Sequence, residues 1–418
     1  MSEGTTLSKL ARFKEWVVYG LIFLFPIAGV TVQHWFSAIF VLLSLISLWD
    51  LIKYRGKRPT LFKPEKIWLW FCAGFFITFM VSGLVNGWGH LQTRYLGVDI
   101  RYLLVVPLYL MLRQYQYAWR YLLAGLLLAP LCLAGQAYYD EFELHLPRAQ
   151  GFYSPNLLGP VAALVALWLL SSWRLWGWRL RWLLPILAMA ALWAMVMSGS
   201  RGAYLGMIAM ALMLVLLMLR HWWRLVGIVM VLVLPVVVYH LVPSVAQRVD
   251  TAVSEVDTYF EELHEGKHYI GGTVIRFEMW RSAWIVFEDS PILGIGRGNY
   301  PEVMRQYVEA GKVPAAVSYH GHAHNAYVDV LLSRGITGFV IFLGMLFYPL
   351  YYFVKTRHLS PDTAVFGIMQ VIGFAVFSMT DASTFIMGNF TSIFLLCMSV
   401  FLSWHVTCVN QSESRREV

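Results

Sequence analysis

Three short segments of the sequence hold side chains that could do chemistry together. Residues 198–202 read Ser-Gly-Ser-Arg-Gly, Arg276 opens an aromatic-rich segment, and residues 320–325 read His-Gly-His-Ala-His-Asn. The planar guanidinium of arginine binds phosphate oxygens through two parallel hydrogen bonds. A neutral histidine can take a proton from an attacking hydroxyl. Two arginines and a histidine would therefore suit a reaction at a phosphate-bearing substrate.

Each segment also has a plainer interpretation. The segment around Arg201 could be a capped turn whose arginine reaches the membrane interface, and Arg276 could be solvated or bound to a lipid headgroup. His320, His322 and His324 would share one face of an extended segment, so they could bind a metal ion. No carboxylate or cysteine stands beside them in the sequence to complete such a site. We therefore predict a site with no metal and no cofactor.

The composition places these segments in a membrane protein. Of the 418 residues, 59% are hydrophobic and 13% are charged, whereas globular domains carry about 25% charged residues. A soluble chain would lack the polar side chains to cover its surface, and lipid removes that need. The 18 Trp and 22 Tyr also fit, because both rings concentrate at membrane interfaces. The alternation of a membrane barrel is absent, so we predict an all-α polytopic membrane protein.

A helix that crosses the bilayer needs about 17–25 largely apolar residues. About twelve such spans are predicted, at residues 16–33, 35–52, 67–85, 99–112, 119–138, 157–172, 182–198, 202–219, 223–242, 325–354, 362–380 and 385–406. One long segment interrupts this rhythm. The chain is therefore expected to divide into four parts, namely transmembrane helices in 1–242, a large loop 243–320, transmembrane helices in 321–406 and a tail 407–418.

Lysine and arginine predict the orientation, because short cytoplasmic loops carry most of them. If the N-terminus is cytoplasmic, twenty of the 32 Lys and Arg lie in cytoplasmic segments or helix ends and only five lie at short outer ends. The five outer residues are Arg94, Arg101, Arg148, Arg201 and Arg334. We therefore predict that both termini are cytoplasmic and that the loop 243–320 lies outside the cytoplasm.

This orientation brings two of the chemical segments to the same side. The spans that begin near Arg201 and His324 both run from outside to inside, so their N-termini point outward. A helix N-terminus carries a partial positive charge and binds anions. The same potential should lower the pKa of His324 and keep its ring neutral, as a general base requires. We predict an extracytoplasmic site for a phosphorylated lipid, with a base available.

The loop contains a predicted amphipathic helix between Arg276 and Asp289. Its aromatic side chains fall on one face at helical spacing. They are Phe277, Trp280, Trp284 and Phe287. Arg276 lies at one edge of this aromatic stripe and Arg281 near the other. Such a helix would lie on the membrane or pack against the bundle.

These motifs resemble those of the O-antigen ligase and polymerase family of bacterial membrane glycosyltransferases. The resemblance covers roughly residues 150 to 345 and rests on four pieces in order. They are Gly199-Ser-Arg-Gly202, Arg276 followed by Trp280, Ser290-Pro-Ile-Leu-Gly-Ile-Gly-Arg-Gly-Asn-Tyr300, and His322-Ala-His-Asn-Ala-Tyr327. The pair His324-Asn325 is also followed, after nine residues, by Gly335-Ile-Thr-Gly338, a spacing typical of the ligases.

The resemblance implies a reaction and roles. Such enzymes move a glycan from undecaprenyl pyrophosphate to an acceptor at the periplasmic face of the inner membrane, without ATP or a nucleotide sugar. The ligases attach O-antigen to a sugar hydroxyl of lipid A–core during lipopolysaccharide synthesis. By position, Arg201 and Arg276 would hold the pyrophosphate and His324 would be the base, with Asn325 orienting it. A single displacement of this kind inverts the anomeric centre.

Other polar side chains on the outer side are weaker candidates for contacts with the acceptor or the lipid phosphate. Arg281 shares the amphipathic helix but points away from Arg276, so we expect it to matter less. The full set is Arg94, Asp99, Arg101, Arg281, Arg297, His322, Asn325 and Asp381. Membrane lipids and the two lipid-linked glycans are the expected partners, and nucleic acid is not.

Several functions remain open at this point. The chain length and the spacing after His324-Asn325 favour a ligase over an O-antigen polymerase, which shares the motifs and topology. A protein O-glycosyltransferase would be expected to carry an extra soluble domain, and the sequence contains none. A transporter of lipid-linked sugars would instead require polar residues deep in the bundle or paired broken helices, and the sequence indicates neither.

Overall fold

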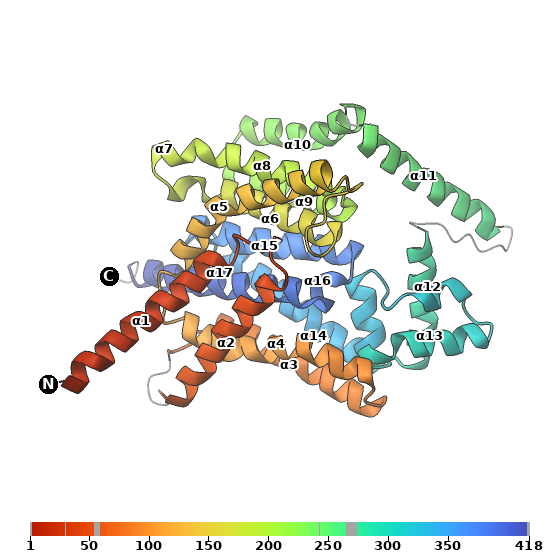
Figure 1. Ribbon diagram of the computed structural model, residues 1–418, viewed down its shortest axis with the longest axis horizontal. Helices are drawn as coiled ribbons and strands as arrows, with labels where there is room; N and C mark the ends of the chain where they lie inside the picture. The colour runs from red at the N-terminus through yellow and green to blue at the C-terminus, as the bar shows by residue number, and fades with distance from the viewer. Residues whose placement is uncertain (1, 30, 54–58, 242, 265–273, 416–418) are drawn as a thin grey trace.

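The computed structural model of the protein describes residues 2–29, 31–53, 59–241, 243–264 and 274–415 (Figure 1). Eleven helices among these residues are long and apolar enough to cross a membrane, and no strand is found among them. The eleven are α2 (Trp35–Lys53), α3 (Lys63–Val85), α4 (His90–Leu112), α5 (Ala118–Tyr138), α6 (Pro155–Ser171), α8 (Leu183–Ser198), α9 (Arg201–Met218), α10 (Trp222–Leu241), α14 (Ala326–Thr356), α15 (Pro361–Thr380) and α17 (Gly388–Ser414). The prediction of an all-α polytopic membrane protein is confirmed.

The first predicted span and the predicted C-terminal tail differ from the structure. The first span was expected at 16–33, but helix α1 (Ser2–Leu24) ends just before Phe25-Pro26 and turns follow. Proline disfavours the helical conformation of the residue before it, which explains the early end. The predicted tail from Thr407 is instead the last part of α17. Thr407 supports this extension, because its hydroxyl donates to the Ser403 carbonyl and accepts from Arg113.

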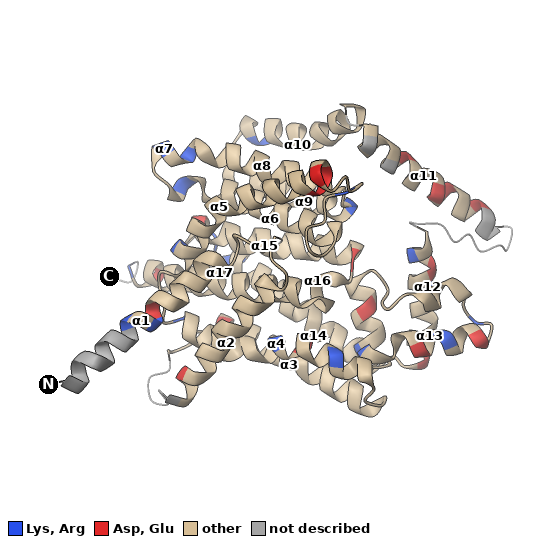
Figure 2. Cartoon of the chain, viewed as in Figure 1, with Lys and Arg blue, Asp and Glu red and all other residues tan. Residues whose placement is uncertain are grey.

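The helices form one bundle in which α1 begins and α17 ends at the same end, opposite the long loop (Figure 1). We call the end near the long loop the loop end. Helices α6, α15 and α17 lie at the centre, and most of their residues are buried. Helix α10 lies at the edge, where it packs on α9 and α11 (Pro243–His264). Basic residues of α1 and of the short helix α7 (Trp178–Arg181) lie at the end away from the loop (Figure 2).

Helix α14 is broken near its start, where the sequence predicted a continuous span over 325–354. Gly335 adopts φ +63°, and a Cβ atom there would lie 2.2 Å from the Ile292 carbonyl oxygen. The loop 290–296 fills the break, because Ile295 N–H donates to Leu332 O (3.0 Å) and Ile336 N–H donates to Pro291 O (2.8 Å). Ser82 of α3 adds a hydroxyl bond to Leu293 O. The segment that contains Gly294, Gly296 and Gly298 therefore has a structural role, because it binds the backbone groups that the break in α14 leaves unpaired.

The described part of the long loop folds onto the loop end around a small core of its own. Helix α12 (Ile275–Asp289) packs on α14, and α13 (Tyr300–Glu309) packs on a 3₁₀ turn at Ala315–Tyr319. The predicted aromatic stripe is not the buried face of α12. Buried positions include Met279, Ala283 and Val286, whereas Trp284 is 55% exposed. Residues 265–273, which include Lys267, lie outside the described residues, as do the basic Arg55, Lys57 and Arg58.

Candidate functional site

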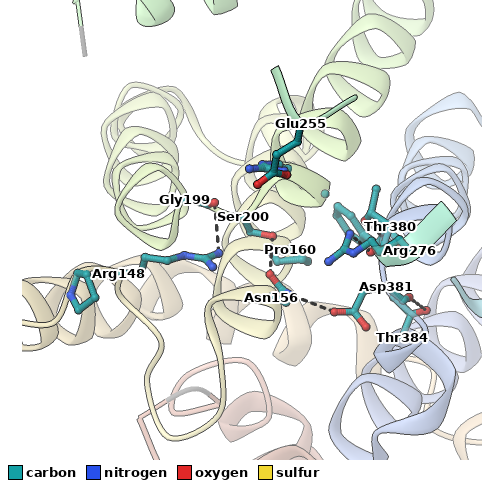
Figure 3. Close-up of a pocket in the computed structure, with 14 residues that line it drawn as sticks. Arg148, Asn156, Pro160, Gly199, Ser200, Glu255, Arg276, Thr380, Asp381 and Thr384 are labelled. Carbon is teal, nitrogen blue, oxygen red and sulfur yellow. Dashed lines mark hydrogen bonds between the residues drawn. The ribbon is translucent and has the colours of Figure 1, made fainter. Parts of the chain in front are cut away.

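A pocket of about 340 Å³ opens at the loop end of the bundle (Figure 3). It is lined by the start of α6, the turn between α8 and α9, one residue each of α11 and α12, and the junction between α15 and α16 (Ser383–Ile386). Its polar lining residues are Arg148, Asn156, Ser200, Arg201, Glu255, Arg276, Thr380, Asp381 and Thr384. The two arginines predicted to hold a phosphate therefore share one pocket.

The turn before α9 presents Arg201 to this pocket. Gly199 ends α8 with φ +55°, a left-handed conformation that glycine adopts without strain. Arg148 holds the turn, since its guanidinium donates to the carbonyls of Ser198 (2.8 Å) and Gly199 (3.2 Å). A Cβ atom at Gly202 would lie 2.1 Å from the Thr380 hydroxyl. The absence of a side chain at Gly202 thus lets α9 approach α15. The segment 198–202 is therefore a structural turn that also positions Arg201 in the pocket.

Arg276 reaches the pocket from α12. Its Nη1 donates to the carbonyl of Thr380, the last residue of α15, at 2.8 Å. Burial lowers the pKa of the Arg276 guanidinium, Asp381 opposes the shift, and the charge of Arg201 adds to it. The two guanidiniums are therefore close enough to repel each other, and an anion bound between them would relieve that repulsion.

Asp381 lies directly after α15 and faces the same pocket. Its Oδ2 accepts from Asn156 Nδ2 of α6 and its Oδ1 accepts from Ser383 N–H, both at 2.9 Å. Burial would raise the pKa of Asp381, but the Ser383 hydrogen bonds and the nearby His322 and His324 leave it below its ordinary value. An ionised carboxylate therefore stands beside the two arginines and the histidines.

His324 lies in a tight turn just before α14. Its φ is +49°, a left-handed conformation that costs a non-glycine residue roughly 1–2 kcal/mol. Its backbone N–H donates to His322 Nδ1 at 3.2 Å, and the two rings lie 4.2 Å apart. Burial, aided by the charge of His322, lowers the pKa of His324 to about 4. The pKa is low, as the sequence argument expected, but burial rather than the helix end is the main cause.

The ring of His324 keeps one nitrogen available among the described residues. Its Nδ1 is buried and has no hydrogen-bond partner among the described residues. Asn325 is the N-cap of α14, because its side-chain oxygen accepts from the N–H groups of Tyr327 (3.0 Å) and Val328 (3.3 Å). The pair His324-Asn325 thus joins a candidate base to the residue that starts the helix.

The histidines also have a carboxylate neighbour that the sequence argument missed. His322, His324 and Asp381 each offer one potential metal-ligating atom, and these atoms lie within 4.8 Å of one another. A carboxylate therefore does complete a potential three-ligand set, because the fold brings Asp381 to the histidines from a distant part of the chain. Both Asp381 oxygens already accept hydrogen bonds, from Asn156 and Ser383.

Of the eight predicted substrate contacts, Asp381 lines the pocket and the other seven do not; His322 and Asn325 instead flank His324, which also lies outside the pocket lining. Arg281 pairs with Glu278 on its own helix at 2.9 Å, and Arg94 is exposed on α4. Arg101 donates to the backbone carbonyl of Gly97. Arg297 is buried against Asp99, as is Arg334 of α14. Buried charges must be paired, so Asp99 and Arg297 form a structural cluster that the sequence could not reveal.

Other pocket residues were missed by the sequence analysis. Arg148 was counted only as an outer basic residue, and Asn156 and Glu255 were not singled out. Asn156 stands in the first turn of α6, two residues after Ser154. A polar amide at the start of an otherwise apolar span was the one available signal for it.

Part of the chain is similar to a known protein family. Residues 186–343 match the family model described as O-antigen ligase. An uncharacterized protein of Haemophilus influenzae is 23% identical over 376 residues, which cover 86% of this chain and 92% of that protein. The matched family region contains Arg201, Arg276 and His324. Part of this bundle of membrane-spanning helices, residues 186–343, is therefore similar to the O-antigen ligase family.

Proposed function

We propose that this protein is an O-antigen ligase, which transfers a glycan from undecaprenyl pyrophosphate to a sugar hydroxyl of lipid A–core. One observation carries the proposal. Arg201 and Arg276 line one pocket together with Asp381, and a ring nitrogen of His324 lies within 4.8 Å of the Asp381 carboxylate. The site thus offers a cationic seat for pyrophosphate next to a neutral base.

The proposed reaction is one displacement at the anomeric carbon of the donor. Arg201 and Arg276 bind the pyrophosphate and stabilise the charge it gains as the bond between carbon and oxygen breaks. The acceptor hydroxyl oxygen forms the new bond from the opposite side, so the anomeric centre inverts. The hydroxyl proton passes to His324. The negative charge of Asp381 stabilises the imidazolium that results.

The site is proposed to face the periplasm. Among the described residues, most of the basic residues that the positive-inside rule counts lie toward the end of the bundle away from the loop (Figure 2). With that end in the cytoplasm, both termini are cytoplasmic and the residues 243–320 form a periplasmic loop of an inner-membrane protein. The lipid-linked donor and lipid A–core then meet at the pocket from the outer leaflet.

Two other functions are weighed against the ligase. An O-antigen polymerase would use the same donor and the same pocket, so it is the main alternative. A transporter was expected to need buried polar residues or paired broken helices. The bundle does contain one broken helix and the buried cluster of Asp99, Arg297 and Arg334. These charges pair with one another, and the break is filled by the loop 290–296, which favours an enzyme.

The test is a lipopolysaccharide gel of a strain that lacks this gene, with the wild-type gene on a plasmid as control. A ligase loss should leave bare lipid A–core, with glycan polymer remaining on the carrier. A polymerase loss should leave core that bears a single repeat unit. An unchanged ladder of long glycans would contradict both proposals.

We also propose that the reaction needs no metal. Two arginines supply positive charge at the pocket, and both oxygens of Asp381 are engaged by protein hydrogen bonds. Purified enzyme should therefore keep its transfer rate in excess EDTA. Loss of activity with EDTA, restored by one divalent cation, would instead assign His322, His324 and Asp381 to a metal site.

A further inference from the structure

We propose that Trp280 is a positioning residue that fixes the turn carrying His324, an inference that rests on the proposed function. The indole Nε1 of Trp280 donates to the carbonyl oxygen of Ala323 at 2.9 Å. Ala323 is fully buried between His322 and His324. The hydrogen bond therefore acts on the peptide unit that joins Ala323 to the candidate base.

The same residue is held from its other side. The N–H of Ala323 lies 3.4 Å from Oδ1 of Asp329, one turn into α14. Helix α12 thus binds the carbonyl of Ala323 and helix α14 binds its amide. His324 follows directly with φ +49°, a conformation that persists only where the surroundings impose it. Removal of one of these two hydrogen bonds to Ala323 should let the turn relax and should move the imidazole of His324.

Trp280 also relates the base to the phosphate site. It lies four residues after Arg276 on α12, so the two side chains project from the same side of the helix one turn apart. Arg276 donates to Thr380 at the end of α15, and Trp280 donates to Ala323 before α14. One rigid helix therefore sets the distance between the pyrophosphate seat and the base.

The test uses Trp280→Phe, which keeps an aromatic ring and removes the indole donor. We expect kcat for glycan transfer to fall by about 10- to 100-fold, the scale of a small misplacement of a reacting group. The KM for the lipid-linked donor should change by less than about twofold, because Arg201 and Arg276 remain. Trp284→Phe is the matched control. Trp284 lies one turn further along α12, is 55% exposed and donates to Glu288 of the same helix, so its loss should leave kcat within about twofold.

A double variant separates positioning from simple destabilisation. If Trp280 acts through His324, then adding Trp280→Phe to His324→Ala should cause no further loss. A folding defect would lower activity by the same factor in both backgrounds, and that result would overturn the inference. Wild-type kcat in Trp280→Phe would overturn it as well. High activity of His324→Ala alone would instead refute the proposed base, whatever the tryptophan variants show.

Discussion

His324→Ala should lower the rate of glycan transfer by about 10²–10⁴, the usual cost of removing a general base, while the protein still binds its lipid-linked donor. The reason is that His324 takes part only in the transfer of the acceptor proton, whereas Arg201 and Arg276 bind the donor. The measurement is single-turnover transfer by purified enzyme, alongside a separate donor-binding assay. Transfer at a near wild-type rate by normally expressed His324→Ala would refute the mechanism.

Two further readouts sharpen this prediction. His320→Ala is the matched control, because His320 belongs to the same segment but is not part of the cluster of His322, His324 and Asp381. The pH profile is the second readout. With the pKa of His324 at about 4, the base stays neutral down to that pH, so kcat/KM should hold between pH 7 and pH 5. A base with the ordinary histidine pKa would lose roughly 30-fold over that range.

Arg201→Lys and Arg276→Lys should each lower kcat by about 10²–10³, the scale for loss of a donor that stabilises charge in the transition state. Lysine keeps the positive charge but loses the planar fork that grips phosphate oxygens. Arg276→Lys also loses the 2.8 Å bond to the Thr380 carbonyl. Both proteins should insert and fold, which can be checked by their elution as single species in detergent.

Arg281→Lys is the control for the arginine variants. Arg281 lies on the same helix as Arg276, but it pairs with Glu278 and does not line the pocket. Its substitution should leave transfer within about threefold of wild type. Essential Arg281 together with dispensable Arg276 would mean that the other face of α12 turns toward the substrate.

The membrane-spanning helices could be predicted from the sequence because lipid leaves few choices. A segment in hydrocarbon must satisfy its backbone internally, so long apolar runs become helices. The predicted end of the first span was wrong because the helix ends before Pro26. The break in α14 could not be predicted either. Glycine is common in membrane helices, and only the packing of the loop 290–296 makes Gly335 a point of interruption.

Some residues of the candidate site could be predicted from the sequence because they lie at the starts of helices. Arg201 and His324 stand at helix starts, where the orientation of the spans places them without any knowledge of packing. Asp381 and Asn156 meet them only through the packing of α6 against α15. Arg297 was predicted to contact the substrate, but it does not line the pocket. Its guanidinium is instead buried in an ion pair with Asp99 of α4. Side-chain pairing between distant helices leaves no trace in spacing.

The break in α14 ties the formation of the site to the docking of segments that lie far apart in the sequence. A helix interrupted at Gly335 exposes backbone groups that lipid cannot satisfy, at several kcal/mol for each group left without a partner. Those groups are covered only when the loop 290–296 and Ser82 of α3 have docked. The turn with His324 directly precedes the same helix, eleven residues ahead of Gly335. A protein in which these segments have not docked would therefore hold Arg201 without an ordered turn at His324.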